Sequence, residues 1–224
     1  MSIQIQKDEV LRYLNYKGQE IDYITNHLIN ESIKEIEDII TPKFTYREFG
    51  LVNRGEIIYL DGSKFSLEGH SIRKHLKNSE RCILIAFTLG HQVDRLIRYY
   101  EKSNMTKAII LDACASTAIE EFADNICRDL EKTYRKYGEK LTGRFSPGYG
   151  DLDIGIQGAF LDLLDARKSM GLTVSSHSIL IPRKSVTAII GIIHKDIIHK
   201  ERACKDCYKY GDCNFIKGDD GRGN

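Results

Sequence analysis

The chain has 224 residues, of which 42% are hydrophobic and 29% are charged, and its formal net charge is +1. This length suffices for one domain with a buried core, and no apolar run approaches the ~18 residues needed to span a bilayer. A charge near zero disfavours an electrostatically driven nucleic-acid binder. Because no export signal is visible at the N-terminus, we expect a cytoplasmic protein with neither nucleic acid nor membrane as partner.

Helix and strand patterns alternate in the first half of the chain. The run at 82–87 (CILIAF) is too apolar to have a solvent-facing side, so it predicts a buried central strand. Pro42 ends a helix, because the residue before a proline is disfavoured in helical conformation. The other expected elements are a helix at 8–14, a helix with Ile21, Ile24, Leu28, Ile36 and Ile39 on one face, strands at 43–49 and 56–60, and a short helix at 71–76.

A very long helical segment dominates the second half. Residues 106–137 contain neither proline nor glycine, which predicts one very long helix or two abutting ones, ended by Gly138. Further on, Ile156, Ala159, Phe160, Leu163 and Leu164 have the spacing of an amphipathic helix, which Gly171 would close, and strands are expected at 179–181 and 186–193. Because helices and strands cluster without strict alternation, we predict an α+β fold. It would be a single domain with a mostly antiparallel, bent sheet flanked by helices, including one long central helix.

The most informative motif is the segment 144–151, with the sequence RFSPGYGD. Proline and glycine fix the backbone between an arginine that can pair with a carboxylate and a tyrosine that can pack against a flat or cationic group. Such a loop suits a ligand that carries an amino acid, whereas the alternative is a rigid connection with solvated charges. The common motifs of nucleotide hydrolases, Rossmann dehydrogenases, zincins and α/β-hydrolases are absent.

Two blocks resemble the activation domain of cobalamin-dependent methionine synthase. The Arg-x-x-Pro-Gly-Tyr core at 144–149 is similar to the family's R-x-A-P-G-Y segment, and residues 181–191 (IPRKSVTAIIG) resemble its W-P-x-x-S-V-S-G block. The segments 10–14 and 88–90 are similar to short, free-standing members, so the resemblance covers roughly residues 8–193. Gly150-Asp151 departs from the family, which has P-A-C-P at this place.

The resemblance implies a protein that binds S-adenosylmethionine and assists the reductive remethylation of cob(II)alamin on a corrinoid-binding methionine synthase subunit. A flavodoxin or ferredoxin-type protein would donate the electron. Because the D-x-H-x-x-G pattern of corrinoid-binding domains is absent, the cobalamin would be carried by the partner. This chain would then be a component of the methyltransferase system of methionine biosynthesis, and it would position groups rather than perform acid–base catalysis.

The family also implies roles for individual residues. Arg144 would bind the carboxylate of S-adenosylmethionine, and Tyr149 would line the ligand and face the corrinoid. The backbone around Ser146, with Gly148, would hold the adenine side. Glu120 matches a family glutamate that contacts the cofactor, with Glu121 as the alternative counterpart. Without the family context, Glu120 would be taken for part of a solvated helix face.

Three cysteines near the C-terminus, Cys204, Cys207 and Cys213, follow the pattern C-x2-C-x5-C. With His199 they can form a tetrahedral zinc site, and the three thiolates suit an iron-sulfur cluster equally well. The alternatives are an unligated tail with reactive thiols or a redox disulfide.

We therefore divide the chain into an activation-like domain at 1–198 and a cysteine-containing tail at 199–224. A rival hypothesis gives the main role to the tail. The protein would then be a metal- or iron-sulfur-binding accessory protein that docks on a corrinoid protein and reduces it without S-adenosylmethionine. A third possibility is a docking subunit that binds neither ligand nor metal.

Overall fold

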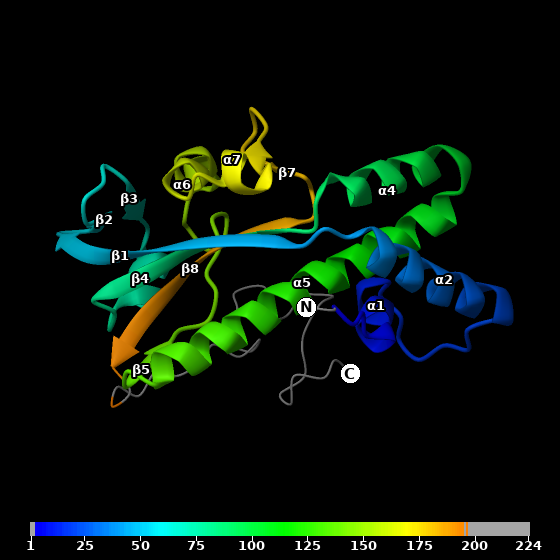
Figure 1. The fold of residues 1–224 in the computed structure, drawn as a ribbon, viewed down its shortest axis with the longest axis horizontal. Coiled ribbons are helices and arrows are strands. Elements are labelled where there is room, and N and C mark those ends of the chain that lie inside the picture. Colours follow the sequence, from blue (N-terminus) through cyan, green and yellow to red (C-terminus); the bar gives the residue numbers. More distant parts are fainter. Residues whose placement is uncertain (1–2, 195, 197–224) are drawn as a thin grey trace.

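A six-stranded sheet organises the computed structural model, which describes residues 3–194 and 196 (Figure 1). The strand order is β3-β2-β1-β4-β8-β5, and every neighbouring pair is antiparallel. The predicted α+β class and antiparallel sheet are therefore confirmed. The strands are β1 (Lys43–Arg54), β2 (Ile57–Leu60), β3 (Ser66–Glu68), β4 (Arg81–Thr88), β5 (Glu139–Leu141) and β8 (Ser185–His194), and a separate hairpin joins β6 (Thr173–Val174) to β7 (Leu180–Ile181).

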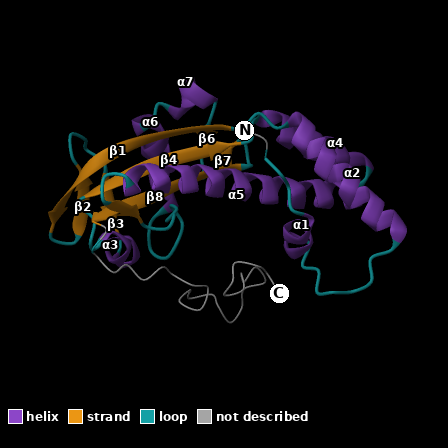
Figure 2. Cartoon of the chain, turned by 60° about the horizontal axis from the view of Figure 1, so that its bottom comes forward, coloured by secondary structure: helices purple, strands orange, loops and turns teal. Residues whose placement is uncertain are grey.

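Strand β4 is the centre of the sheet, as its apolar sequence predicts. It pairs with β1 on one side and with β8 on the other, and all its residues from Cys82 to Thr88 are buried. Its side chains alternate between two cores, with Ile83 and Ile85 in one and Leu84 in the other. Helices cover both faces of the sheet, which is why this strand has no polar side (Figure 2).

The long helix α5 (Met105–Arg135) is continuous over 31 residues and packs along one face of the sheet (Figure 1). Asn104 begins it, because its side-chain oxygen accepts a hydrogen bond from the Lys107 amide at 3.1 Å. No helix in the described part of the chain is long and apolar enough to cross a membrane. The other helices are α1 (Lys7–Tyr13), α2 (Tyr23–Ile39) and α4 (His91–Ser103), which contact α5, and α3 (His70–Leu76), α6 (Gln157–Leu163) and α7 (Ala166–Met170), which cover the opposite face.

Two details of the helix prediction are wrong. The apolar face of α2 does not include Ile24, which is 78% exposed, because it lies about 120° around the helix from the buried Ile36. The helix expected from Ile156 to Gly171 is interrupted at Asp165, whose φ of 48° breaks it into the 3-10 turn Ile154–Ile156, α6 and α7. This turn redirects the chain so that the residues on both sides of it stay in one core.

The core facing α5 gives a direct stability test. Phe87 is fully buried, and its ring meets that of Phe122 on α5 edge-on at 5.9 Å. Phe87→Ala should lower the free energy of unfolding by about 3–5 kcal/mol, as measured by urea denaturation. The control Tyr23→Ala, at a side chain 81% exposed, should change it by less than about 0.5 kcal/mol. Equal effects of the two variants would contradict this packing.

Candidate ligand-binding site

A polar stripe runs along one side of α5. Asp112, Ser116, Glu120 and Asp124 are spaced four residues apart, so their side chains follow one another at intervals of about 6 Å. Each of the four contacts a cationic side chain from the C-terminal half of the chain. The stripe therefore joins the long helix to loops that lie far from it in sequence.

Arg144 is the first of these cations. Its Nη2 donates to Glu120 Oε2 at 2.7 Å and to Asp124 Oδ1 at 2.8 Å, and its side chain is 19% exposed. The neighbouring residue, Phe145, fixes its place by exchanging two main-chain hydrogen bonds with Ile189 of β8, at 3.0 and 2.8 Å. The sheet edge and the helix thus hold the guanidinium between them.

One nitrogen of this guanidinium has no partner. Arg144 Nη1 is buried and makes no hydrogen bond within the described residues. Burial acts to lower the pKa of Arg144, whereas the charges of Glu120 and Asp124 act to raise it, and the net result is a raised pKa. Two carboxylates against one guanidinium leave one net negative charge beside an unused donor. This combination suits a ligand that carries both a carboxylate and a positive charge.

Lys184 contacts the other end of the stripe. Its Nζ lies 2.9 Å from both Asp112 Oδ1 and Ser116 Oγ, and its side chain is only 12% exposed. Lys184 directly precedes β8, and Arg144 belongs to the loop that crosses the edge of the same strand. The two sequence blocks that carry the family resemblance therefore meet on one side of α5.

The loop at 144–151 is anchored to α3 by its last residue. Asp151 accepts hydrogen bonds from the main-chain amides of His70 at 2.7 Å and Ser71 at 2.9 Å. Gly150 has φ of 58°, and a Cβ there would lie 2.5 Å from Ser71 Oγ, so only glycine fits. This contact gives Gly150-Asp151 a structural role at the place where the methionine synthase family has a different sequence.

Comparison with known proteins supports the fold. No protein-family model and no curated protein matches the chain. Among solved structures, a crystal structure of the MetH reactivation domain bound to AdoHcy matches with a TM-score of 0.64 over 90% of this chain and 77% of that one. The two sequences are 14% identical. The chain has the fold of this reactivation domain.

The reactivation-domain fold brings together the residues that the family resemblance named. Glu120 and Arg144 form a direct ion pair, and Ser146, Gly148 and Tyr149 follow on the same loop. The fold also distinguishes between the two neighbouring glutamates. Glu121 turns to its own helix, where its Oε1 accepts from Asn125 at 3.0 Å and lies 3.3 Å from Arg128. Whether these residues bind the cofactor stays a prediction.

The sequence analysis missed three neighbours of this site. Asp124 could have been found, because it lies one helical turn after Glu120. Tyr13 of α1 carried no signal: burial raises its pKa, and the charge of Glu120 raises it further. The Arg12 guanidinium lies 4.5 Å from the centre of the Tyr13 ring, which places α1 beside the stripe. Only the packing of α1 on α5 reveals this.

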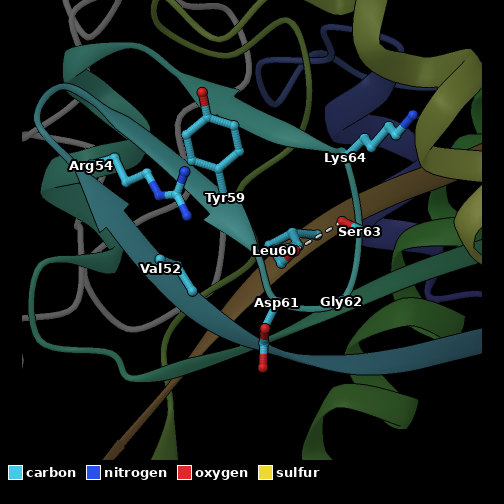
Figure 3. Close-up of a pocket in the computed structure, with 8 residues that line it drawn as sticks. All are labelled: Val52, Arg54, Tyr59, Leu60, Asp61, Gly62, Ser63 and Lys64. Atoms are coloured by element: carbon cyan, nitrogen blue, oxygen red, sulfur yellow. Dashed lines mark hydrogen bonds between the residues drawn. The ribbon is translucent and has the colours of Figure 1, made fainter.

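A surface hollow of about 500 Å³ lies elsewhere, at the β1–β2 hairpin (Figure 3). Arg54 points toward the ring of Tyr59, and its Cζ is 5.5 Å from the ring centre. The side chains of Asp61 and Lys64 point away from this pair (Figure 3). Because its polar groups diverge, this hollow is a poorer candidate for a ligand than the α5 stripe.

The proposed metal ligands Cys204, Cys207, Cys213 and His199 lie outside the described residues. Within residues 3–194 and 196, no group of three or more His, Cys, Asp or Glu side chains could hold a metal ion. Cys127, near Arg144, is a free thiol, and burial raises its pKa to about 11. This thiol is therefore neutral and unreactive at physiological pH.

The anchor at Asp151 predicts a pH-dependent stability. Its hydrogen bond from the Ser71 amide lowers the pKa of Asp151 below the ordinary value of 3.8. A carboxyl with a lowered pKa stabilises the fold above its unfolded-state pKa, and the effect is lost as pH falls through the folded-state pKa. Asp151→Ala should therefore lower the melting temperature near neutral pH, and the difference from wild type should shrink below pH 3.8.

Calorimetry over a pH series would measure both effects. Asp162→Ala is the matched control, because Asp162 is exposed on α6 and its side chain makes no hydrogen bond to the described residues. A melting-temperature difference for Asp151→Ala that stays constant as pH falls would contradict the anchor.

Proposed function

We propose that this protein binds S-adenosylmethionine between α5 and the 144–151 loop and assists the reductive remethylation of cob(II)alamin on a partner methionine synthase in the cytoplasm. One observation carries the proposal: a buried guanidinium nitrogen, Arg144 Nη1, lacks a partner beside two carboxylates. The likeness to a reactivation domain whose crystal structure contains AdoHcy supports the choice of ligand.

The charges of the site match those of S-adenosylmethionine. The ligand's carboxylate would accept a hydrogen bond from Arg144 Nη1, which satisfies the buried donor. Its ammonium and sulfonium groups would lie near Glu120 and Asp124, whose combined charge exceeds that of Arg144. Tyr149 is 58% exposed on the same loop and is therefore accessible to a corrinoid partner.

The mechanism asks this chain to position the methyl donor. The corrinoid, when bound to its partner protein, supplies the nucleophile that receives the methyl group, and a flavodoxin or ferredoxin-type protein supplies the electron. Arg144 and Glu120 orient the amino-acid end of the ligand. The sulfonium then has a fixed direction relative to the exposed Tyr149 surface, and such orientation lowers the barrier to methyl transfer.

Two measurements test the proposal together. Calorimetry should show that the purified protein binds S-adenosylmethionine. Mixing it with cob(II)alamin-loaded methionine synthase that lacks an activation domain, a reductant and S-adenosylmethionine should produce the absorption spectrum of methylcobalamin. The absence of binding at millimolar ligand would refute the proposal.

Arg144→Ala should weaken S-adenosylmethionine binding about 30-fold or more, or roughly 2 kcal/mol, because it removes a buried charged donor. Arg183→Ala is the matched control, since the Arg183 side chain is half-exposed and its nearest carboxylates lie 3.8 and 3.9 Å away. Isothermal titration calorimetry on both variants, with circular dichroism to verify folding, would measure the difference. Equal losses would argue against a ligand role for Arg144.

Glu120→Gln should distinguish a charged ligand from a neutral analogue. The substitution removes a negative charge and should weaken binding of the sulfonium S-adenosylmethionine about tenfold more than binding of the thioether S-adenosylhomocysteine. Glu121→Gln is the control, because Glu121 contacts Asn125 and Arg128 on its own helix. Competition titrations would give both affinities, and an unchanged ratio for Glu120→Gln would exclude contact with the sulfonium.

The rival hypothesis of a metal- or iron-sulfur-binding accessory protein stays a prediction from the cysteine pattern. Metal analysis and absorption spectroscopy of anaerobically purified protein would test it. Cys204→Ser should abolish bound metal without affecting S-adenosylmethionine binding, whereas Arg144→Ala should do the reverse. A protein with neither ligand nor metal would point to a docking subunit.

A further inference from the structure

One short stretch of the β8 edge is left open beside the 144–151 loop. Phe145 and Ile189 donate a main-chain hydrogen bond to each other, so the N–H and C=O of Ile189 point away from β4 and toward the loop. The direction of these groups alternates along a strand, so those of Ser185 and Thr187 also point toward this edge. At the far end, Lys184 points back and accepts from the Leu89 amide at 3.0 Å.

Pro147 explains why the pairing stops. Continuing the antiparallel register past Phe145 and Ile189 would bring Pro147 opposite Thr187, but proline has no N–H to donate. The loop turns away instead, and the Tyr149 amide donates to Ser146 O at 3.0 Å. Within the described residues, no hydrogen bond reaches the main-chain N–H or C=O of Thr187 on this edge.

These unpaired groups are buried. Thr187 is 1% exposed, and its hydroxyl donates to Gln157 Oε1 at 2.8 Å on the opposite side of the sheet from α5. Buried main-chain groups are paired in more than about 90% of cases, because leaving them unpaired is costly. A donor and an acceptor lying side by side in one plane therefore need an outside partner.

We infer that the main-chain N–H and C=O of Thr187 bind the hydrogen-bonding edge of the ligand's adenine ring, an assignment that rests on the proposed function. The N1 atom of adenine accepts and its N6 amino group donates, which complements a main-chain N–H and C=O. The open stretch holds only Ser185 and Thr187, too short for an added strand, since strands span about 3–10 residues.

The position also fits the rest of the site. Thr187 lies two residues, or about 7 Å, along β8 from the point where the loop carrying Arg144 crosses. One ligand that carries an amino acid at one end and a nucleoside at the other can reach both places. Ser146, whose backbone the family resemblance associates with the adenine side, lies between Phe145 and the turn at Pro147.

Amide hydrogen exchange followed by NMR tests this assignment, with S-adenosylhomocysteine as the probe. Saturating ligand should slow exchange of the Thr187 amide about tenfold or more, because the amide becomes hydrogen-bonded. The Ile189 amide is the internal control, since it already donates to Phe145 and should change far less. An analogue with a dimethylated N6, which cannot donate, should bind about tenfold more weakly by calorimetry.

The outcomes separate the two claims. If S-adenosylhomocysteine binds but Thr187 exchange is unchanged relative to Ile189, the adenine assignment is wrong and the proposed function stands. The same conclusion follows if the dimethylated analogue binds as tightly as S-adenosylhomocysteine. If calorimetry detects binding of neither S-adenosylmethionine nor S-adenosylhomocysteine, both claims fail.

Discussion

The ion pairs of Arg144 with Glu120 and Asp124 are the interaction on which the site depends. Arg144 comes from a loop, the two carboxylates come from the long helix, and Phe145 ties the loop to the sheet edge. Breaking a buried pair on one side leaves an uncompensated charge, which is strongly destabilising. The same contact therefore fixes the loop, sets its distance from α5 and determines which nitrogen remains available to a ligand.

Much of the fold is visible in the sequence because it depends on local pattern. The apolar run at 82–87 identifies β4, and the absence of proline and glycine identifies α5. The errors concern features that depend on neighbours. Ile24 has the right spacing but no surface to pack against, and Asp165 adopts a left-handed conformation that its sequence does not demand. In both places tertiary packing overrides the local pattern.

The site was predictable to a similar extent. The Pro-Gly loop and its flanking residues carry a motif, so Arg144, Tyr149 and Glu120 could be named. Their arrangement could not, because the contact between Arg144 and Glu120 joins residues 24 apart that meet only after α5 packs on the sheet. The unpaired edge at Thr187 was invisible for the same reason, although Pro147, which causes it, was part of the motif.

The internal partners of Arg144 seem at first to oppose a role in ligand binding, since its Nη2 is already bonded. They favour it if binding requires a fixed donor. A free arginine side chain loses up to about 2 kcal/mol of rotamer entropy when a ligand orders it, whereas Arg144 is ordered beforehand. The planar guanidinium then holds Nη1 at a set angle while Nη2 remains on the helix. A lysine could neutralise the same carboxylates, but its single nitrogen could not keep that contact and present a second, directed donor.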